Sequence, residues 1–443
     1  MKKHEQVSIV LFMHSNIMGV LYMKTYPKDK VNVAFIGVSK RGLGLLNMVL
    51  DSMEDVNITA VCDLYADRVD EAKKAVTDKR GTVPFATQDY REILKRDDVD
   101  AVITPSSWES HLDIVINAMN AGKYAASEVG GANSLDQCWE LVKTYERTKC
   151  PAMILENCCY GKTEMMILNM VKKGIFGELI HAEGGYEHDL RKEVAMGNEN
   201  RHYRLNNYKN RNGELYPTHE LGPISKWLSI NRGNRMLTLC SMASKSKGIN
   251  EWIQTRKGPE YENAGYDFAE GDVVTTMIKC AHGETILLIH DTSLPRPYSR
   301  GNRLQGTKAI WLEDKMSLFI DGVSPSAGWD HSWEEYEKYY DRYEHPLWKW
   351  YREKGLVGGH DGMDYLSMRG FIEAVKNGTQ TPIDVYDMAA WMSITCLSEE
   401  SVAMGGHPVA IPDFTNGRWI NREQVQESRY CLEKICSDDY YRL

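Results

Sequence analysis

Short apolar runs alternate with helical stretches through the first third of the chain. Val31–Ile36 is a β-branched apolar run, and the residues that follow Gly37 carry apolar side chains at helical spacing. A second apolar run over 58–62 ends at Asp63 and precedes a charged helical stretch. Strands that alternate with helices at this pitch predict a parallel, doubly wound sheet over residues 31–155. Its further elements are expected over 66–76, 100–104, 111–121, 124–127 and 150–157.

The pattern changes beyond residue 155. Alternating apolar positions over 273–280 and 285–290, joined by a His282-Gly283 turn, predict an antiparallel hairpin. The second domain, residues 156–443, is therefore expected to be α+β, with a large and mainly antiparallel sheet. Its other strands are expected within 303–320, and its helices over 364–376 and 385–403.

Residues 1–30 form an N-terminal extension before the first clear strand. An apolar run over 7–23 follows Lys2 and Lys3, as in an export signal, but His14, Ser15 and Asn16 interrupt it and no small-x-small cleavage site follows. We expect an extension before an internal start at Met23, and hence a cytoplasmic protein. If residues 1–30 act as a signal instead, the protein is periplasmic or exported.

Composition narrows the classes of partner. The 443 residues carry 53 basic and 62 acidic side chains, a net charge of -9, so no basic footprint for nucleic acid is expected. No apolar run reaches the roughly 18 residues of a membrane span. The ten cysteines form no CxxC and no zinc pair, which indicates reduced thiols and no metal site. The 24 tyrosines and 11 tryptophans, against 8 phenylalanines, suit a surface that binds a polar ligand such as a sugar.

The stretch from Gly37 to Gly42 lies between the first strand and the first helix, where a dinucleotide pyrophosphate would meet a helix N-terminus. It departs from GxGxxG because Ser39 replaces the middle glycine. Asp63, 21 residues beyond Gly42, ends the second strand, where a carboxylate binds ribose hydroxyls and repels a 2′-phosphate. The order strand, turn, helix, strand, Asp predicts an NAD-binding Rossmann domain.

Long motifs extend this interpretation. The first domain resembles the Gfo/Idh/MocA oxidoreductases, but where these carry Glu-Lys-Pro the chain has Glu128, Val129 and Gly130, without the hydride-site lysine. Over residues 31–420 the chain closely resembles glycoside hydrolase family 109, the NAD-dependent α-N-acetylgalactosaminidases. The motifs are ENCCYG (156–161), GGYEHDLR (184–191), RNGELYPTHELGP (211–223), HDTSLPRPYS (290–299), YEHPLW (343–348), GGHDGMDY (358–365) and DFTNGRW (413–419).

The resemblance, together with the glycine turn, implies two sets of contacts. Ser39 and Lys40 depart from the family's phosphate loop, and Ser110 replaces a more usual aromatic residue. The implied NAD contacts are Gly37, Ser39, Arg41, Gly42, Asp63, Trp108, His111, Glu128, Val129 and Asn157. The implied substrate contacts are Tyr186, Arg204, Tyr216, Pro217, Thr218, His219 and Tyr298.

The resemblance implies hydrolysis through sugar oxidation at C3, loss of the C2 proton, elimination, water addition and re-reduction, an exception to the two-carboxylate rule. Tyrosine and histidine suit these proton transfers if charge moves their pKa values towards neutrality. Tyr186 and His188 lie two apart on a strand and share a face. Tyr216 and His219 flank a turn-like Pro217-Thr218. These four are the expected catalytic residues, with the first pair near C2–C3 and the second near C1; the reverse assignment stays open.

Two other functions remain open at this stage. A net sugar oxidoreductase of the Gfo/Idh/MocA type would release a keto sugar and NADH, and a sensor would bind sugar and nucleotide without turnover. A Tyr-x-His on a strand is more often a half-buried structural pair than a catalytic one. His219-Glu220 lacks the second histidine of a zinc helix, so no metal is expected. The expected partner is a small carbohydrate or the non-reducing end of a glycan, and a homo-oligomer is left open.

Overall fold

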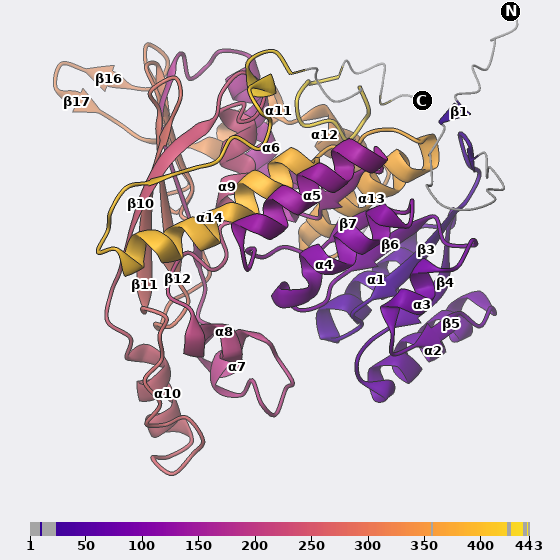
Figure 1. The fold of residues 1–443 in the computed structure, drawn as a ribbon. Helices are drawn as coiled ribbons and strands as arrows, with labels where there is room; N and C mark the ends of the chain where they lie inside the picture. The colour runs from indigo at the N-terminus through magenta and orange to yellow at the C-terminus, as the bar shows by residue number, and fades with distance from the viewer. Residues whose placement is uncertain (1–8, 11–23, 356–357, 423–426, 437–440, 442–443) are drawn as a thin grey trace, which may run out of the picture.

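Two sheets organise the chain in the computed structural model, which describes residues 9–10, 24–355, 358–422, 427–436 and 441 (Figure 1). Residues 1–8 and 11–23 lie outside this range, so the expected extension and its alternative as a signal stay predictions. None of the helices within the described residues is long and apolar enough to span a membrane.

The first sheet has six parallel strands in the order β5-β4-β3-β6-β7-β8. This is the strand order of a dinucleotide-binding Rossmann fold, so the predicted parallel, doubly wound sheet is confirmed. The strands are β3 (Val31–Ile36), β4 (Val56–Cys62), β5 (Phe85–Thr87), β6 (Ala101–Thr104), β7 (Tyr124–Ser127) and β8 (Ala152–Ile154). The helices between them are α1 (Lys40–Ser52), α2 (Ala66–Arg80), α3 (Tyr90–Leu94), α4 (Trp108–Asn120) and α5 (Leu135–Thr148).

The second sheet has nine strands in the order β18-β15-β14-β13-β9-β12-β11-β10-β19. Only the β9–β12 pair is parallel among its pairings, and β11 with β12 forms the predicted antiparallel hairpin. Alternate residues of β11 are buried, so one face of the sheet carries the core. The strands are β9 (Leu179–Glu187), β10 (Met236–Ala243), β11 (Val273–Cys280), β12 (Thr285–Asp291), β13 (Arg303–Gly306), β14 (Ala309–Leu312), β15 (Ser317–Ile320), β18 (Glu334–Glu335) and β19 (Val409–Ala410).

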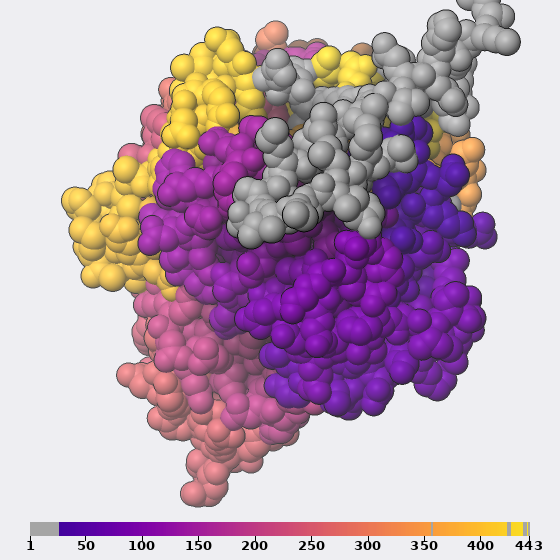
Figure 2. All heavy atoms as spheres, turned by 45° about the vertical axis from the view of Figure 1, so that its right-hand side comes forward, coloured from indigo at the N-terminus to yellow at the C-terminus, as the bar shows by residue number. Residues whose placement is uncertain are grey.

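Helices of the second region join the two sheets. α9 (Thr218–Trp227) packs on β9, and α14 (Val385–Ala403) contacts β10, β8 and α5. Figure 2 shows the yellow C-terminal part of the chain directly beside the purple first domain. Because α14 contacts elements of both sheets, side chains from distant parts of the sequence can meet between them. The remaining helices are α6 (Lys162–Lys172), α7 (Arg191–Ala195), α8 (Arg204–Asn210), α10 (Gly248–Arg256), α11 (Tyr340–Tyr343), α12 (Pro346–Glu353) and α13 (Met363–Asn377).

Short elements complete the described chain. The two-residue strands β1 (Ile9–Val10) and β2 (Lys24–Thr25) pair with each other, as do β16 (Ser326–Ala327) and β17 (Asp330–His331). The 3-10 helices are η1 (Asn157–Tyr160), η2 (Tyr336–Tyr339), η3 (His360–Gly362) and η4 (Arg418–Ile420). Of these, η1 matters most for the site, because it follows β8 where the chain enters the second region.

Candidate functional site

The turn after β3 is built around two glycines. Gly37 has φ 95°, and a Cβ on it would lie 2.6 Å from Ser106 Cα. A Cβ on Gly42 would lie 2.1 Å from the Gly37 carbonyl oxygen. Both positions therefore require glycine, one for its left-handed backbone and both for close packing. The middle position of the motif is Ser39, which is the N-cap of α1.

Two helix N-termini meet where the sheet changes direction. β3 and β6 are neighbours, and chain crossovers leave them towards opposite ends of the sheet, which is the switch point where open α/β sheets bind ligands. Ser39 is the N-cap of α1 and Ser107 is the N-cap of α4, and within the described residues neither serine makes a side-chain cap bond. Their first N–H groups are thus available to an anion, so the residues present fit the pyrophosphate of a dinucleotide.

Asp63 follows β4 beside this turn. Its Oδ2 accepts a hydrogen bond from Val38 N at 2.9 Å, and its Oδ1 accepts one from Tyr65 N at 3.1 Å. The buried carboxylate is thus held next to the glycine turn by backbone groups of both neighbouring loops. That position suits the ribose contact expected from the sequence.

Two expected cofactor residues, Arg41 and Asn157, bind a carboxylate that the sequence analysis did not select, and Arg41 also binds the expected Glu128. The Arg41 guanidinium binds Glu128 at 2.7 Å and Asp364 at 2.7 Å. Asn157 Nδ2 donates to Asp364 Oδ1 at 2.8 Å. Burial alone would raise the pKa of Asp364, but His360 and Arg41 hold that pKa well below its usual range. Asp364 lay inside the GGHDGMDY motif, so a signal for it existed.

The other expected cofactor residues line the same edge of the sheet. His111 Nε2 lies 3.1 Å from Ser106 O, and burial lowers the pKa of His111 to about 4, so the ring is neutral. The Trp108 ring packs on Gly130, where a Cβ would lie 2.4 Å from the ring. Val129 is buried, and its N–H donates to the Glu128 carboxylate. The Glu-Val-Gly sequence therefore makes room for a tryptophan.

The two expected catalytic pairs form one cluster. Tyr186 lies near the end of β9, and its Oη is 3.2 Å from His188 Nδ1. The Tyr216 ring centroid is 4.3 Å from that of Tyr186, and the His219 ring is 4.9 Å from Tyr216 and 5.5 Å from Tyr186. Tyr298 lies 5.1 Å from His188, ring to ring. The Tyr186–His188 pair and the Tyr216–His219 pair are therefore in direct contact and form one site.

Arg204 is the buried cation of this cluster. Its guanidinium carbon lies 5.1 Å from the ring centre of Trp108 and 5.2 Å from that of Tyr216. Nη1 pairs with Glu193 at 3.2 Å, while Nε has no hydrogen-bond partner among the described residues. Trp108 comes from the N-terminus of α4, so Arg204 and Tyr216 connect the dinucleotide edge with the tyrosine–histidine cluster.

Burial moves the tyrosine pKa values in the direction opposite to the one expected. Burial raises the pKa of Tyr186 even though Arg204 opposes the shift, and burial also raises the pKa of Tyr216. The groups of the chain therefore keep both side chains as phenols. Burial and Arg204 lower the pKa of His188, which leaves a neutral imidazole able to accept a proton.

The YPTH segment begins a helix and does not form the expected turn. Pro217 is the N-cap of α9, so Thr218 and His219 are its first two residues, and Thr218 is fully buried. A proline before the first turn is compatible with a helix start because the orphan N–H positions need no donor there. His219 is consequently presented from a rigid helix N-terminus towards Tyr186.

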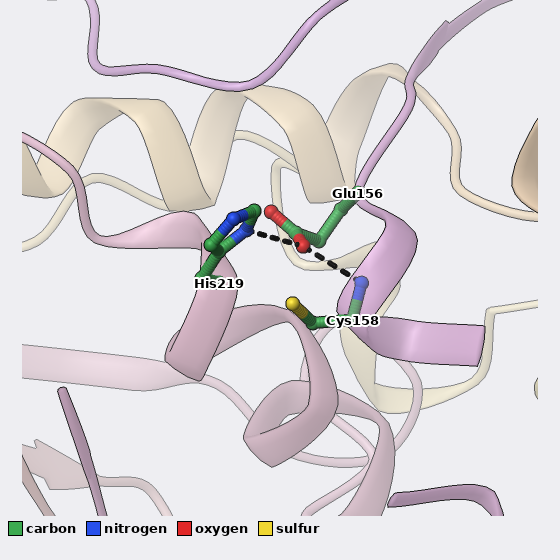
Figure 3. Close-up of side chains that lie close together, drawn as sticks. All are labelled: Glu156, Cys158 and His219. Carbon is green, nitrogen blue, oxygen red and sulfur yellow. Dashed lines mark hydrogen bonds and ion pairs between the residues drawn. The ribbon is translucent and has the colours of Figure 1, made fainter. Parts of the chain in front are cut away.

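His219 is held by a buried carboxylate that the sequence analysis missed as a site residue. His219 Nδ1 lies 2.9 Å from Glu156 Oε1, which also accepts from Cys158 N at 3.0 Å (Figure 3). Burial would raise the pKa of Glu156, but His219 holds it below its usual value. A carboxylate on Nδ1 fixes the imidazole tautomer and leaves Nε2 free to accept a proton. Glu156 opens the ENCCYG motif.

Both regions of the chain match known protein families. Residues 31–155 match the oxidoreductase family with an NAD-binding Rossmann fold, and residues 160–421 match the glycosyl hydrolase 109 C-terminal domain. An α-N-acetylgalactosaminidase of Tannerella forsythia is 39% identical over 412 residues, covering 88% of this chain and 87% of that protein. One of Shewanella oneidensis is 38% identical over 400 residues, covering 88% and 86%.

Solved structures agree on the fold. A levoglucosan dehydrogenase in complex with NADH and levoglucosan has a TM-score of 0.65 at 16% identity, covering 86% of this chain and 100% of that chain. A myo-inositol 2-dehydrogenase of Lactobacillus plantarum has a TM-score of 0.62 at 16% identity, with the same coverage. The first domain is thus a nicotinamide-dinucleotide-binding domain of the Gfo/Idh/MocA type.

Proposed function

Because the chain belongs to glycosyl hydrolase family 109, we propose that it removes terminal α-linked N-acetylgalactosamine from glycans, with NAD as a resident catalyst. One observation supports the proposal most directly: the dinucleotide edge contacts the tyrosine–histidine cluster. The ring centroids of Trp108, on that edge, and Tyr216, in the cluster, lie 5.6 Å apart. Two relatives that are 38–39% identical are named for this activity. Asp63, beside the glycine turn, favours NAD over NADP.

The cofactor, when bound, supplies a hydride acceptor at the sugar C3 carbon and returns the hydride at the end, so its oxidation state does not change over a cycle. Gly37, Gly42 and the N-termini of α1 and α4 would hold its pyrophosphate. Asp63 would bind its ribose, and Trp108, Glu128 and Asn157 line the edge that leads to the sugar.

The side chains of the cluster then move protons. We assign His188 and Tyr186 to C2–C3: the phenol oxygen lies 3.2 Å from the neutral imidazole, and the pair relays the C3 hydroxyl proton to solvent, so that His188 is neutral again before the C2 step. Oxidation at C3 makes the C2 proton acidic, and in this assignment His188 removes that proton as the C1–O bond breaks. Water then adds at C1, and C2 regains a proton. The alternative assignment exchanges the two pairs.

Tyr216 and His219 are placed at C1 and the leaving group. The carboxylate of Glu156 is bound to His219 Nδ1 and orients the ring, so Nε2 would be the atom that transfers a proton to the departing oxygen. Arg204 and Tyr298 would hold sugar hydroxyls through the unpartnered Nε and the half-exposed phenol ring. Each proton taken in elimination is returned in addition, so the net reaction is hydrolysis.

The test uses purified protein, an aryl α-N-acetylgalactosaminide and D2O, with mass analysis of the released sugar. Deuterium at C2 of free N-acetylgalactosamine, without net NADH, is the expected result. Release without deuterium would mean direct displacement and would overturn the mechanism. No release, with NADH appearing on a free sugar, would instead make the protein a dehydrogenase.

The two assignments of the pairs are separated by variants. If His188 serves C2, His188→Asn abolishes deuterium uptake, while His219→Asn slows release of poor leaving groups more than activated aryl groups. The reverse pattern would exchange the pairs. Each variant is measured on a substrate with an activated leaving group and on one with an unactivated leaving group, so the ratio of the two rates can be compared within one variant.

A further inference from the structure

We propose that Glu156, Cys158 and His219 form a binding site for a thiophilic divalent cation such as Zn²⁺. Each residue offers one ligand atom, and these atoms lie within 4.8 Å of one another. Figure 3 shows the carboxylate, the thiol and the imidazole turned towards a common point. The sequence predicted no metal because these residues follow no known spacing: 156 and 158 lie in η1 and its N-cap, and 219 lies in α9.

The ligand types suit zinc and its neighbours. Thiolate, imidazole and carboxylate are the three donors that Zn²⁺ takes from proteins, and three protein ligands with an open fourth position are its usual arrangement at exchangeable sites. Bonds of about 2.0–2.3 Å require the ligand atoms to close to roughly 3.5 Å from one another.

An unpartnered atom points to a missing ligand. Glu156 is fully buried, and its Oε2 makes no well-formed hydrogen bond in the part of the chain that the structure describes, although the neighbouring Thr218 hydroxyl helps to lower the Glu156 pKa. A buried carboxylate oxygen left without a partner is costly, and most such atoms in proteins are bound by a donor, a water or an ion. A cation between Oε2 and the thiol would satisfy it.

The charges around Cys158 influence which cations the proposed site would bind. Arg300 Nη1 lies 3.6 Å from the Cys158 sulfur, and Arg300 itself pairs with Glu164 and Glu313. Burial raises the pKa of the Cys158 thiol although Arg300 opposes the shift, so a metal ion must itself displace the thiol proton. Arg300 also repels a metal ion, whereas the two carboxylates around it reduce that repulsion. The site should therefore select cations that bind sulfur strongly over Mg²⁺ or Ca²⁺, which prefer oxygen ligands.

Proton balance gives the consequence. The cation takes the lone pair of His219 Nδ1, so the hydrogen that Nδ1 shared with Glu156 moves to Nε2, and the Cys158 thiol proton leaves to solvent. His219 then has no free nitrogen for proton transfer. Inhibition by micromolar Zn²⁺, reversed by a chelator, follows. That inhibition rests on the proposed function, whereas the binding does not.

The test is a Co²⁺ titration of the holoenzyme, followed by absorption. Tetrahedral cobalt with a thiolate ligand gives intense visible bands and a sulfur-to-metal charge-transfer band, which need no enzyme activity. We expect these bands in the wild type, their displacement by Zn²⁺, and at least about tenfold weaker binding in Cys158→Ala. The matched control is Cys159→Ala, the adjacent buried cysteine outside the ligand set.

Each outcome decides the matter. Bands in the wild type and in Cys159→Ala, but not in Cys158→Ala, support the site; bands that persist in Cys158→Ala, or no bands in the wild type, overturn it. If Cys158→Ala does not fold, Cys158→Ser gives the same comparison, since oxygen replaces sulfur and abolishes the charge-transfer band. Activity with and without Zn²⁺ is compared within each variant. Bands without glycosidase activity would leave the site intact and refute only the proposed function.

Discussion

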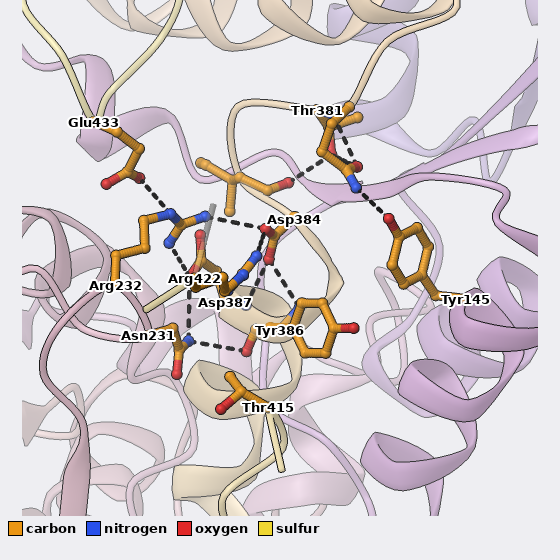
Figure 4. Close-up of polar contacts among 12 residues, drawn as sticks. Tyr145, Asn231, Arg232, Thr381, Asp384, Tyr386, Asp387, Thr415, Arg422 and Glu433 are labelled. Carbon is orange, nitrogen blue, oxygen red and sulfur yellow. Dashed lines mark hydrogen bonds and ion pairs between the residues drawn. The ribbon is translucent and has the colours of Figure 1, made fainter. Parts of the chain in front are cut away.

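Two buried polar clusters lie in the second region of the chain and are built differently. One, which we call the ion cluster, joins α9, the N-terminus of α14 and the C-terminal segment (Figure 4). Its three cations and three carboxylates balance, and every cation contacts at least one carboxylate. Its members are Lys226, Arg232, Arg422, Asp384, Asp387 and Glu433.

The charged groups of the ion cluster pair mainly with one another, although Arg232 Nε and Arg422 Nη1 make no hydrogen bond among the described residues. Lys226 Nζ lies 2.7 Å from Asp387 and 2.8 Å from Glu433, and Arg232 binds Asp387 at 2.8 Å and Asp384 at 3.0 Å. Asp384 also caps α14 through Tyr386 N and its neighbour. Arg232 and Lys226 lower the pKa of Asp387 to about 2 although burial opposes it. Carboxylates paired in this way stay charged and hold three segments together.

The tyrosine–histidine cluster is open. Trp108 Nε1, Arg204 Nε and Glu156 Oε2 are buried yet have no hydrogen-bond partner among the described residues. Native proteins satisfy nearly all such atoms, so a concentration of exceptions beside shifted pKa values marks a place where a ligand completes the structure. Such atoms occur in both clusters, but only the tyrosine–histidine cluster contacts the dinucleotide edge, so we expect a ligand there and a structural role for the ion cluster. Four substitutions test that distinction.

The largest effect is expected at His219. The side-chain nitrogen of asparagine can replace Nδ1 as the donor to Glu156, but asparagine has no proton-accepting nitrogen, so His219→Asn should lower kcat by about 10²–10⁴-fold with little change in folding. Steady-state kinetics and thermal unfolding measure the two. Tyr266→Phe, far from the cluster contacts, is the control. A loss below tenfold would place His219 outside the chemistry.

The next effect is expected at Asp387. Asp387→Ala leaves Lys226 and Arg232 short of a partner, and breaking a buried pair should lower the free energy of unfolding by about 3–5 kcal/mol. Turnover per folded molecule should remain. Urea denaturation measures the first quantity and active-site titration the second. Asp78→Ala, at an exposed pair with Lys74, should change stability by no more than about 0.5 kcal/mol. Equal losses in both variants would contradict the contrast between the clusters.

A smaller effect is expected at Arg204. Lysine keeps the charge but loses the planar fork that lies against Trp108 and Tyr216, so Arg204→Lys should raise KM about tenfold and change kcat less. Arg191→Lys, whose partner Asp189 lies outside the cluster, should leave both constants nearly unchanged. A fall in kcat alone would mean that Arg204 acts on the reacting atoms and not on binding.

The smallest effect on activity is expected at Glu214, behind the cluster, where the change is in the pH dependence of stability. Burial raises its pKa to about 8, while in the unfolded chain a glutamate has a pKa of about 4.3. The folded state therefore holds a proton that the unfolded state lacks across this range, and the free energy of unfolding falls as pH rises from 5 to 8. Glu214→Gln should remove that part of the slope, as urea denaturation at pH 5, 6.5 and 8 would show. An unchanged slope would refute it.

Local patterns allowed most of the first domain to be predicted. β7 was expected over the residues it occupies, because a short apolar run between turn residues specifies a buried strand. α4 begins at Trp108 and not at 111. Ser107 is its N-cap, and the first turn lies before the residues whose apolar spacing predicted the helix. The YPTH segment was expected to be a turn because Pro217 is a strong turn former, but the burial of Thr218 against the sheet favours a helix start.

The sequence by itself determined the order of strands and helices, the glycine turn with Asp63, and the residue types of the candidate site, because these depend on local periodicity and on motifs. Only the tertiary structure decided which of them meet. Asp364 reaches Arg41 across 323 residues, and Glu156 reaches His219 across 63, through packing of α13 and α9 that no local pattern encodes. The pKa directions also depend on burial, so the raised values of Tyr186 and Tyr216 could not be read from residue type alone.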